Sequence, residues 1–201
     1  MQVTIPENIS DITLEQFQKF TKLIERDDLN EIELQKRLIS IFTNIKYNDT
    51  DKISKIDFDD LVNSINKAMG IETPFNNTFK LNGVDYGFIP NLDNITAKEW
   101  MDLQLYPLNK TETLHKLMAI LFRPITKKDS FSNYKIESYN GTEDRAELFK
   151  YMPMNVVNGA IGFFLTLQKQ LLNHIQKSMI QEQQREAKQM STFLSGDGMQ
   201  P

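Results

Sequence analysis

The segment DTDKISKIDFDD, residues 49–60, spaces its carboxylates in a way that could bind calcium. An EF-hand loop takes its ligands from positions 1, 3, 5, 7, 9 and 12, and position 6 is glycine. Aspartates stand at positions 1, 3, 9 and 12 of this segment, as Asp49, Asp51, Asp57 and Asp60. The spacing therefore keeps open a calcium-responsive protein with a degenerate EF-hand-like loop.

Three positions of this loop depart from what calcium coordination needs. Ile53 offers no side-chain oxygen at position 5, and Ser54 at position 6 disfavours the left-handed backbone that glycine adopts without strain. Asp60 is one methylene shorter than the usual bidentate glutamate of position 12. The other interpretation is that these acids begin a helix, whose dipole favours negative charge in its first turn. We expect this second interpretation to hold, and calcium binding to be weak or absent.

Other catalytic and metal-binding chemistries lack their residues. The chain has no cysteine, and its two histidines, His115 and His174, are not spaced to ligate one metal from one face of a helix. No Gly-x-Ser-x-Gly turn presents a nucleophile, and no glycine-rich stretch ends in the Lys-Ser/Thr of a phosphate-binding loop. We therefore expect no enzyme, no metal site, no cofactor, and two partly buried structural histidines.

Composition limits the partners of the chain. The formal net charge is −4, which disfavours non-specific attraction to nucleic acid or anionic lipid. The apolar run Val156–Leu167 is interrupted by Asn158 and is well short of the ~20 residues that span a bilayer. The N-terminus has no basic region followed by an apolar core, so we expect no signal peptide. These features indicate protein partners, with no nucleic acid and no membrane.

Residues 1–72 predict an N-terminal three-helix unit. Thr13 with Gln16 forms a capping-box signature before the first helix, Asn30 caps the second, and Gly70 ends the third. Apolar residues follow helical spacing in all three: Leu14, Phe17, Leu23 and Ile24 in the first, Leu34, Leu38, Ile41, Phe42 and Ile45 in the second, and Phe58, Leu61, Val62, Ile65 and Met69 in the third.

Residues 73–175 predict an α+β core. A β-hairpin is expected over residues 78–89, because Asn82-Gly83 suits a type I′ turn, in which both central residues need positive φ. The stretch from Tyr134 to Tyr139 can add a third strand. Helices are expected to begin at three threonines, Thr96, Thr111 and Thr142, and Pro124 is expected to close the second of them. The fold class is therefore mainly α (α+β), a helical domain with a small antiparallel hairpin or three-stranded sheet.

A long C-terminal helix is expected from about Pro153 to Met190. Its first half, Val156–Leu172, is too apolar to stand in water, so we expect the domain to cover it, with Gly159 and Gly162 allowing close approach of a neighbour. Residues 176–201 read as a polar helical arm and a loose tail. Two interpretations of this arm stay open: a solvated, fraying helix, or a segment that a partner orders. The second predicts partner-binding residues at Ile175, Met179, Ile180 and Gln183.

Three segments together are similar to a known group of proteins: FKLNGVDYGFIPNLDNITAKEW, LHKLMAILFRPI and YKIESYNGTEDRAELFKYMPMNVVNGAIGFF. They resemble structural and assembly proteins of tailed bacteriophages, particularly the crAss-like phages of gut Bacteroidota. The resemblance covers roughly residues 79–172 and carries no catalytic motif. It implies a head or tail component or a tail assembly chaperone, located in the virion or the host cytoplasm. Its partners would be other phage structural proteins, with self-association in a ring as one form of contact.

Overall fold

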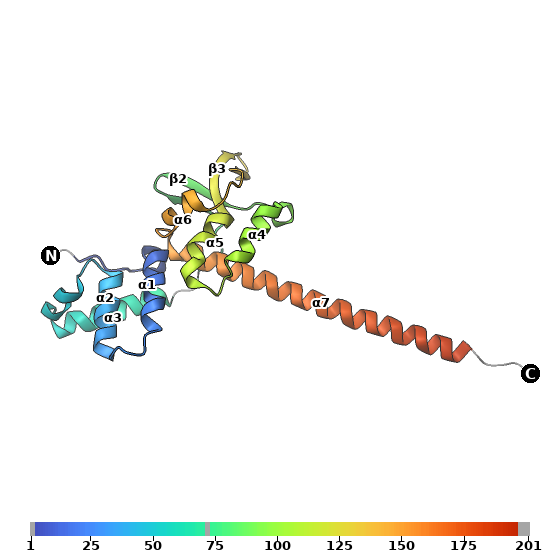
Figure 1. Ribbon diagram of the computed structural model, residues 1–201, viewed down its shortest axis with the longest axis horizontal. Helices are drawn as coiled ribbons and strands as arrows, with labels where there is room; N and C mark the ends of the chain where they lie inside the picture. Colours follow the sequence, from blue (N-terminus) through green and yellow to red (C-terminus); the bar gives the residue numbers. More distant parts are fainter. Residues whose placement is uncertain (1–2, 71–72, 197–201) are drawn as a thin grey trace, which may run out of the picture. The chain divides into compact units, whose positions relative to one another are not determined.

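The computed structural model of the 201-residue chain describes residues 3–70 and 73–196. The chain is mainly α-helical with one small antiparallel sheet, which confirms the expected fold class. It divides into two units, Met1–Ile161 and Gly162–Pro201. Figure 1 labels the main helices and strands.

The first unit begins with three helices, α1 (Leu14–Ile24), α2 (Glu31–Phe42) and α3 (Lys55–Met69), with 3-10 turns at Ile9–Asp11 and Tyr47–Lys52. The predicted capping box of α1 is present: the Gln16 amide donates to Thr13 Oγ1 at 3.3 Å, and the Thr13 amide donates to Gln16 Oε1 at 2.9 Å. Asn30 and Glu33 cap α2 in the same way. The apolar faces of the three helices meet in a core that includes Leu14, Leu23, Leu38, Ile39, Phe42, Leu61 and Ile65.

A four-stranded antiparallel sheet follows, made of β1 (Thr78–Leu81), β2 (Val84–Phe88), β3 (Phe122–Lys128) and β4 (Tyr134–Ile136) in that spatial order. Asn82 and Gly83 join β1 to β2 with φ values of 47° and 81°. Both central residues of the turn thus have the positive φ that a type I′ turn requires. The predicted hairpin is confirmed.

Strand β3 corrects the expectation that the helix after Thr111 runs on until Pro124. A short 3-10 turn, Thr111–Thr113, leads into α5 (Leu114–Leu121), and the backbone becomes extended at the next residue, Phe122. The apolar run continues without a break across this boundary, so periodicity could not locate it. Pairing with β2, where Phe88 faces Phe122 and Tyr86 faces Pro124, decides the change to strand.

Helices α4 (Ala97–Leu105) and α6 (Glu143–Phe149) complete the packing around α5, and a 3-10 turn at Leu92–Asn94 precedes α4. Aromatic rings link the sheet to α6: Phe79 stacks on Tyr86 at 5.3 Å between centroids, and Phe149 meets both rings edge-on. Nearly every residue of α5 is buried. Helix α4 thus lies beside α5 (Figure 1).

Helix α7 (Met154–Gly196) begins inside the first unit. The Met154 amide donates to the carbonyl of Ile12, and the Leu14 amide donates to the carbonyl of Met152, so the start of α7 is joined to the start of α1. A Cβ on Gly159 would lie 2.6 Å from the carbonyl oxygen of Pro74, whereas one on Gly162 would meet nothing within 4 Å. The predicted close approach is therefore confirmed at Gly159 and wrong at Gly162.

The first residues of α7 are buried within the first unit. Val156, Val157 and Ala160 are buried, but Leu165 and Leu167 are 54% and 41% exposed. The expected coverage is therefore confirmed for Val156, Val157 and Ala160. Leu165 and Leu167 belong to the second unit, and the side chain of Leu172 lies outside the described residues.

Candidate interaction surface on α4

Helix α4 begins with a capping box that uses an acidic residue. The Glu99 amide donates to Thr96 Oγ1 at 3.2 Å, and the Thr96 amide donates to Glu99 Oε2 at 2.6 Å. The sequence predicted this pair of bonds. They leave the second carboxylate oxygen of Glu99 free to bind elsewhere.

That second oxygen forms an ion pair with Arg123 of β3. Arg123 Nη2 lies 2.7 Å from Glu99 Oε1, and the two side chains are only 7% and 4% exposed. Burial lowers the pKa of the Arg123 guanidinium, while the charge of Glu99 acts to raise it. A charge removed from water is stabilised only by such a partner, so the pair fixes Glu99 on the inner side of α4.

A second polar contact holds the same side of α4. The Tyr139 hydroxyl donates to Asp102 Oδ2 at 2.7 Å, and the Arg123 guanidinium lies 5.7 Å from the centre of the Tyr139 ring. Burial, together with the neighbouring Asp102 carboxylate, raises the pKa of Tyr139 well above its usual value. The inner side of α4 is thus anchored through Glu99 and Asp102, two acidic residues three positions apart.

The exposed side of α4 carries three large apolar side chains beside the polar Lys98 and Gln104, more apolar surface than a surface helix usually shows. Trp100, Met101 and Leu105 are 56%, 65% and 64% exposed. Met101 and Leu105 lie one turn apart, so their side chains are neighbours on the helix. Trp100 is the single tryptophan of the sequence. We call Trp100, Met101 and Leu105 the α4 face.

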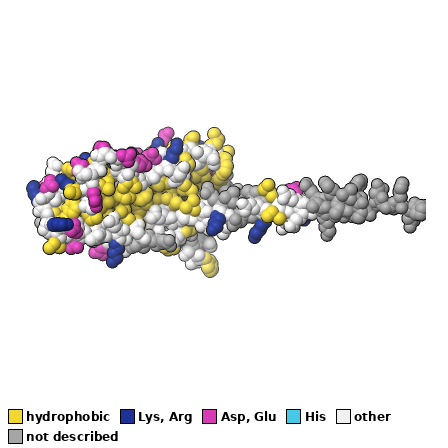
Figure 2. Space-filling model, turned by 90° about the horizontal axis from the view of Figure 1, so that it is seen from below, with side chains coloured by type: hydrophobic (Ala, Val, Ile, Leu, Met, Phe, Trp, Pro, Cys, Tyr) yellow, Lys and Arg dark blue, Asp and Glu magenta, His cyan; other side chains and the backbone are white. Residues whose placement is uncertain are grey.

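Apolar surface is not confined to α4. Figure 2 shows hydrophobic side chains gathered in a band across one face of the globular part, with acidic and basic side chains along its edges. Large exposed patches of this kind on a protein surface mark contact sites more often than isolated apolar residues do.

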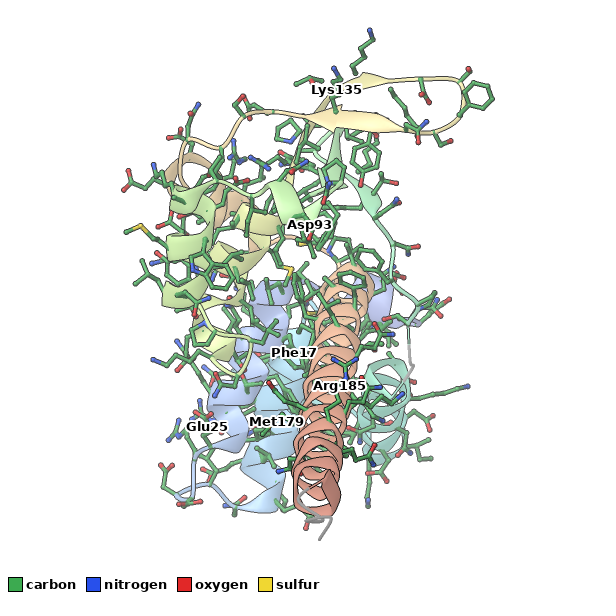
Figure 3. All side chains as sticks on the ribbon, turned by 90° about the vertical axis from the view of Figure 1, so that its right-hand side faces the viewer. Phe17, Glu25, Asp93, Lys135, Met179 and Arg185 are labelled. Atoms are coloured by element: carbon green, nitrogen blue, oxygen red, sulfur yellow. The ribbon has the colours of Figure 1, made fainter. Side chains whose placement is uncertain are left out.

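The partner-binding residues predicted from sequence belong to the second unit. Met179 and Ile180 are more than half exposed, and Gln183 is exposed one turn after Met179. Met179 and Arg185 extend from different sides of α7 (Figure 3). The side chain of Ile175 lies outside the described residues. The structure therefore places three of the four predicted residues on exposed positions of one helix.

The predicted calcium loop is divided between two local structures. Residues 47–52 form a 3-10 turn, and Ser54 then caps α3 by accepting a hydrogen bond from the Asp57 amide at 3.2 Å. Asp57 Oδ2 accepts a bond from the Ser54 hydroxyl at 2.7 Å. Asp57 is thus part of a helix cap, as the helix-start interpretation expects.

The remaining aspartates of the loop have separate lysine partners or face solvent. Asp49 pairs with Lys52 at 2.7 Å, and Asp51 pairs with Lys36 of α2 at 2.8 Å. Asp60 is exposed. Over the residues that the structure describes, no three His, Cys, Asp or Glu side chains come together in a group that could hold a metal ion.

His115 is a buried structural histidine, as expected, and its partner is a residue that sequence reasoning missed. Gln18 of α1 is buried and places its Nε2 3.0 Å from His115 Nδ1. The same nitrogen donates to the backbone carbonyls of Thr111 and Glu112 at 2.8 and 3.1 Å. Burial lowers the pKa of His115. The side chain of His174 lies outside the described residues.

Comparison with known proteins gives no relative: no protein-family model, no curated protein and no solved structure matches the chain. Within residues 3–70 and 73–196, no helix combines the length and the apolar character needed to cross a membrane.

Proposed function

We propose that this protein acts by protein–protein contact, as a structural or assembly component of a tailed bacteriophage. The observation that carries the proposal is the exposed apolar surface of α4, which presents Trp100, Met101 and Leu105 to solvent while Glu99 is buried. The phage context comes from the sequence resemblance across residues 79–172. The role is that of a head or tail component or a tail assembly chaperone, without catalysis.

The energetics of α4 favour a contact role for its face. Fully burying one large apolar side chain stabilises a protein or complex by about 1.5–3 kcal/mol. Three such side chains stand exposed on one short helix, and tryptophan is among the residues that contribute most at protein interfaces. A partner that covers the α4 face would therefore gain several such contributions from a helix that Glu99 and Asp102 already anchor.

The second unit provides a further contact. Met179, Ile180 and Gln183 are exposed on α7, and Leu165 and Leu167 are exposed on the same helix. An amphipathic helix of this type can lie in the groove of another protein or pack against copies of itself. Other phage structural proteins, or copies of this chain in a ring, are the proposed partners.

Site-specific photo-crosslinking in infected host cells tests the proposal. A benzophenone amino acid replaces Met101 on the α4 face, and a matched control replaces Phe131, which is 85% exposed between β3 and β4. We expect position 101 to cross-link to one or a few phage structural proteins identified by mass spectrometry, and position 131 to give none of these products. Equal product patterns at the two positions, or only host proteins at position 101, would reject the proposal.

A further inference from the structure

A basic groove lies between α1 and α2, on the first unit and apart from α4. Its volume is about 380 Å³, and its lining includes Lys19, Lys22, Leu23, Arg26, Arg37, Ser40, Ile41 and Tyr47. Four of these eight residues are basic and none is acidic, although the chain as a whole carries a net charge of −4. The groove thus concentrates positive charge on an otherwise acidic protein.

Two of the four basic residues are already paired at the margins of the groove. Lys19 lies 3.1 Å from Glu15, and Arg26 makes a two-bond contact with Asp28 at 2.6 and 2.9 Å. Lys22 and Arg37 form no ion pair with any residue of the described ranges. The charges without an ion pair among the described residues are therefore those of Lys22 and Arg37, and Asp28 also interacts with Arg37 at longer range.

Arg37 is held against an aromatic ring at the groove. Its guanidinium lies 5.1 Å from the centre of the Tyr47 ring, a cation–π contact. Its Nε is buried and has no hydrogen-bond partner within the part of the chain that the structure describes. The two terminal nitrogens of a guanidinium can match a carboxylate, so an arginine held by an aromatic ring at the groove and without an ion pair among the described residues is suited to receive one.

We propose that this groove binds an acidic segment of a partner protein, with Arg37 and Lys22 pairing its carboxylates. The proposal rests on the protein–protein contact function and adds a second contact of defined chemistry. Leu23 and Ile41 also line the groove, and their aliphatic side chains fit a peptide that carries aliphatic as well as acidic side chains. Glu15 and Asp28 stand beside the groove and oppose a ligand as densely charged as a polyphosphate.

Fluorescence anisotropy with the full-length protein tests this site. The probe is a fluorescein-labelled peptide that alternates glutamate and leucine, and its control replaces each glutamate by glutamine. We expect binding of the glutamate peptide only, weakened by added salt because exposed charges are screened. We expect Arg37→Gln to weaken binding about tenfold or more, and Lys22→Gln to weaken it less. Lys110→Gln, at an exposed lysine outside the groove with no ion pair among the described residues, should leave it unchanged.

The following results would count against binding of an acidic peptide in the groove. No binding, equal binding of the two peptides, or the same loss in Lys110→Gln as in Arg37→Gln would overturn the proposal. Inorganic pyrophosphate that binds at Arg37 when the peptide does not would assign the site to a small phosphate ligand instead. If Arg37→Gln fails to fold, the exposed Lys22 still provides the test. Loss of peptide binding with cross-linking intact at position 101 would reject the groove and leave the proposed function standing.

Discussion

Arg123 Nη2 and Glu99 Oε1 lie 2.7 Å apart in an almost fully buried ion pair that joins β3 to α4. Glu99 also accepts the Thr96 amide, so one carboxylate both begins the helix and attaches it to the sheet. This relationship sets the rotation of α4 about its axis. With Glu99 held on the inner side, Trp100, Met101 and Leu105 face solvent.

Removing one member of this pair should destabilise the protein strongly. Arg123→Leu leaves the buried Glu99 carboxylate without its counter-charge, and we expect a loss of roughly 3–5 kcal/mol in the free energy of unfolding. Urea unfolding followed by the emission of Trp100 measures it. The double variant Glu99→Gln/Arg123→Leu keeps an N3 capping residue and removes both charges, so it should recover most of the loss. A loss below about 1 kcal/mol in the single variant would show that the pair does not anchor α4.

Stability should fall in mildly acidic solution because of His115. Burial is the largest cause that lowers its pKa from 6.5; Lys150 acts in the same direction, and Glu147 opposes them. Because the folded-state pKa is the lower one, the unfolded chain takes up the proton first as the pH falls. The contribution of His115 to the free energy of unfolding is therefore complete above pH 6.5. It declines as the pH falls below 6.5, and it stops changing once the pH is below the folded-state pKa.

The measurement compares wild type with His115→Gln. We expect the free energy of unfolding of wild type to decrease more between about pH 7.5 and pH 5 than that of the variant, which shares every other titrating group. Equal decreases in the two proteins would mean that His115 has the same pKa in the folded and unfolded states.

Two glycines of α7 offer a matched pair of alanine substitutions. Gly159→Ala places a Cβ 2.6 Å from the Pro74 carbonyl oxygen, a backbone atom, so we expect destabilisation of about 1–3 kcal/mol. Gly162→Ala meets nothing and should stabilise the helix by about 0.5–1 kcal/mol. Thermal unfolding followed by circular dichroism measures both. A Gly159→Ala protein as stable as wild type would contradict the close approach of residues 74–75 to α7.

Shortening the arm should separate folding from partner binding. Truncation after Lys177 removes Met179, Ile180 and Gln183, which the first unit does not include, so the melting temperature should stay nearly unchanged. Partner capture should be lost, and the full-length double variant Met179→Ser/Ile180→Ser should lose it as well. Gln176→Ser, at an exposed polar position of the same helix, serves as the control. If the truncated chain assembles normally, the arm is only a solvated helix.

Local sequence signals predicted the parts of the fold that depend on neighbouring residues. These signals are two capping boxes and one hairpin turn, each spanning two to four positions of the chain. The capping boxes of Thr13 with Gln16 and of Thr96 with Glu99, and the turn at Asn82-Gly83, all form as expected. Strand β3 depends on pairing with β2, more than thirty positions earlier, and the apolar run before it reads equally well as helix. Local sequence patterns do not show which distant strand a segment pairs with.

The α4 face was missed for a related reason. A capping box identified Glu99 as a helix-start residue, but its partner Arg123 stands in the strand that was not predicted. Apolar periodicity shows which residues share one side of a helix, but it does not show which side is buried. Without knowledge of the ion pair, the apolar residues Trp100, Met101 and Leu105 would be assigned to the buried side. On α7, the exposure of Met179 and Ile180 agrees with the expected arm because polar residues outnumber apolar ones there.

The central claim, contact through the α4 face in phage assembly, is tested most directly by complementation. Infected hosts lacking the phage copy of the gene would receive wild type or the variant Trp100→Ser/Met101→Ser/Leu105→Ser, and the yield of infectious particles would be counted. Ile56→Ser, on an exposed apolar position of α3, is the control. The account predicts a folded variant with wild-type melting temperature and a yield reduced about tenfold or more, because losing even 1.4 kcal/mol of contact energy weakens binding tenfold. A wild-type yield from the folded α4 variant would contradict it.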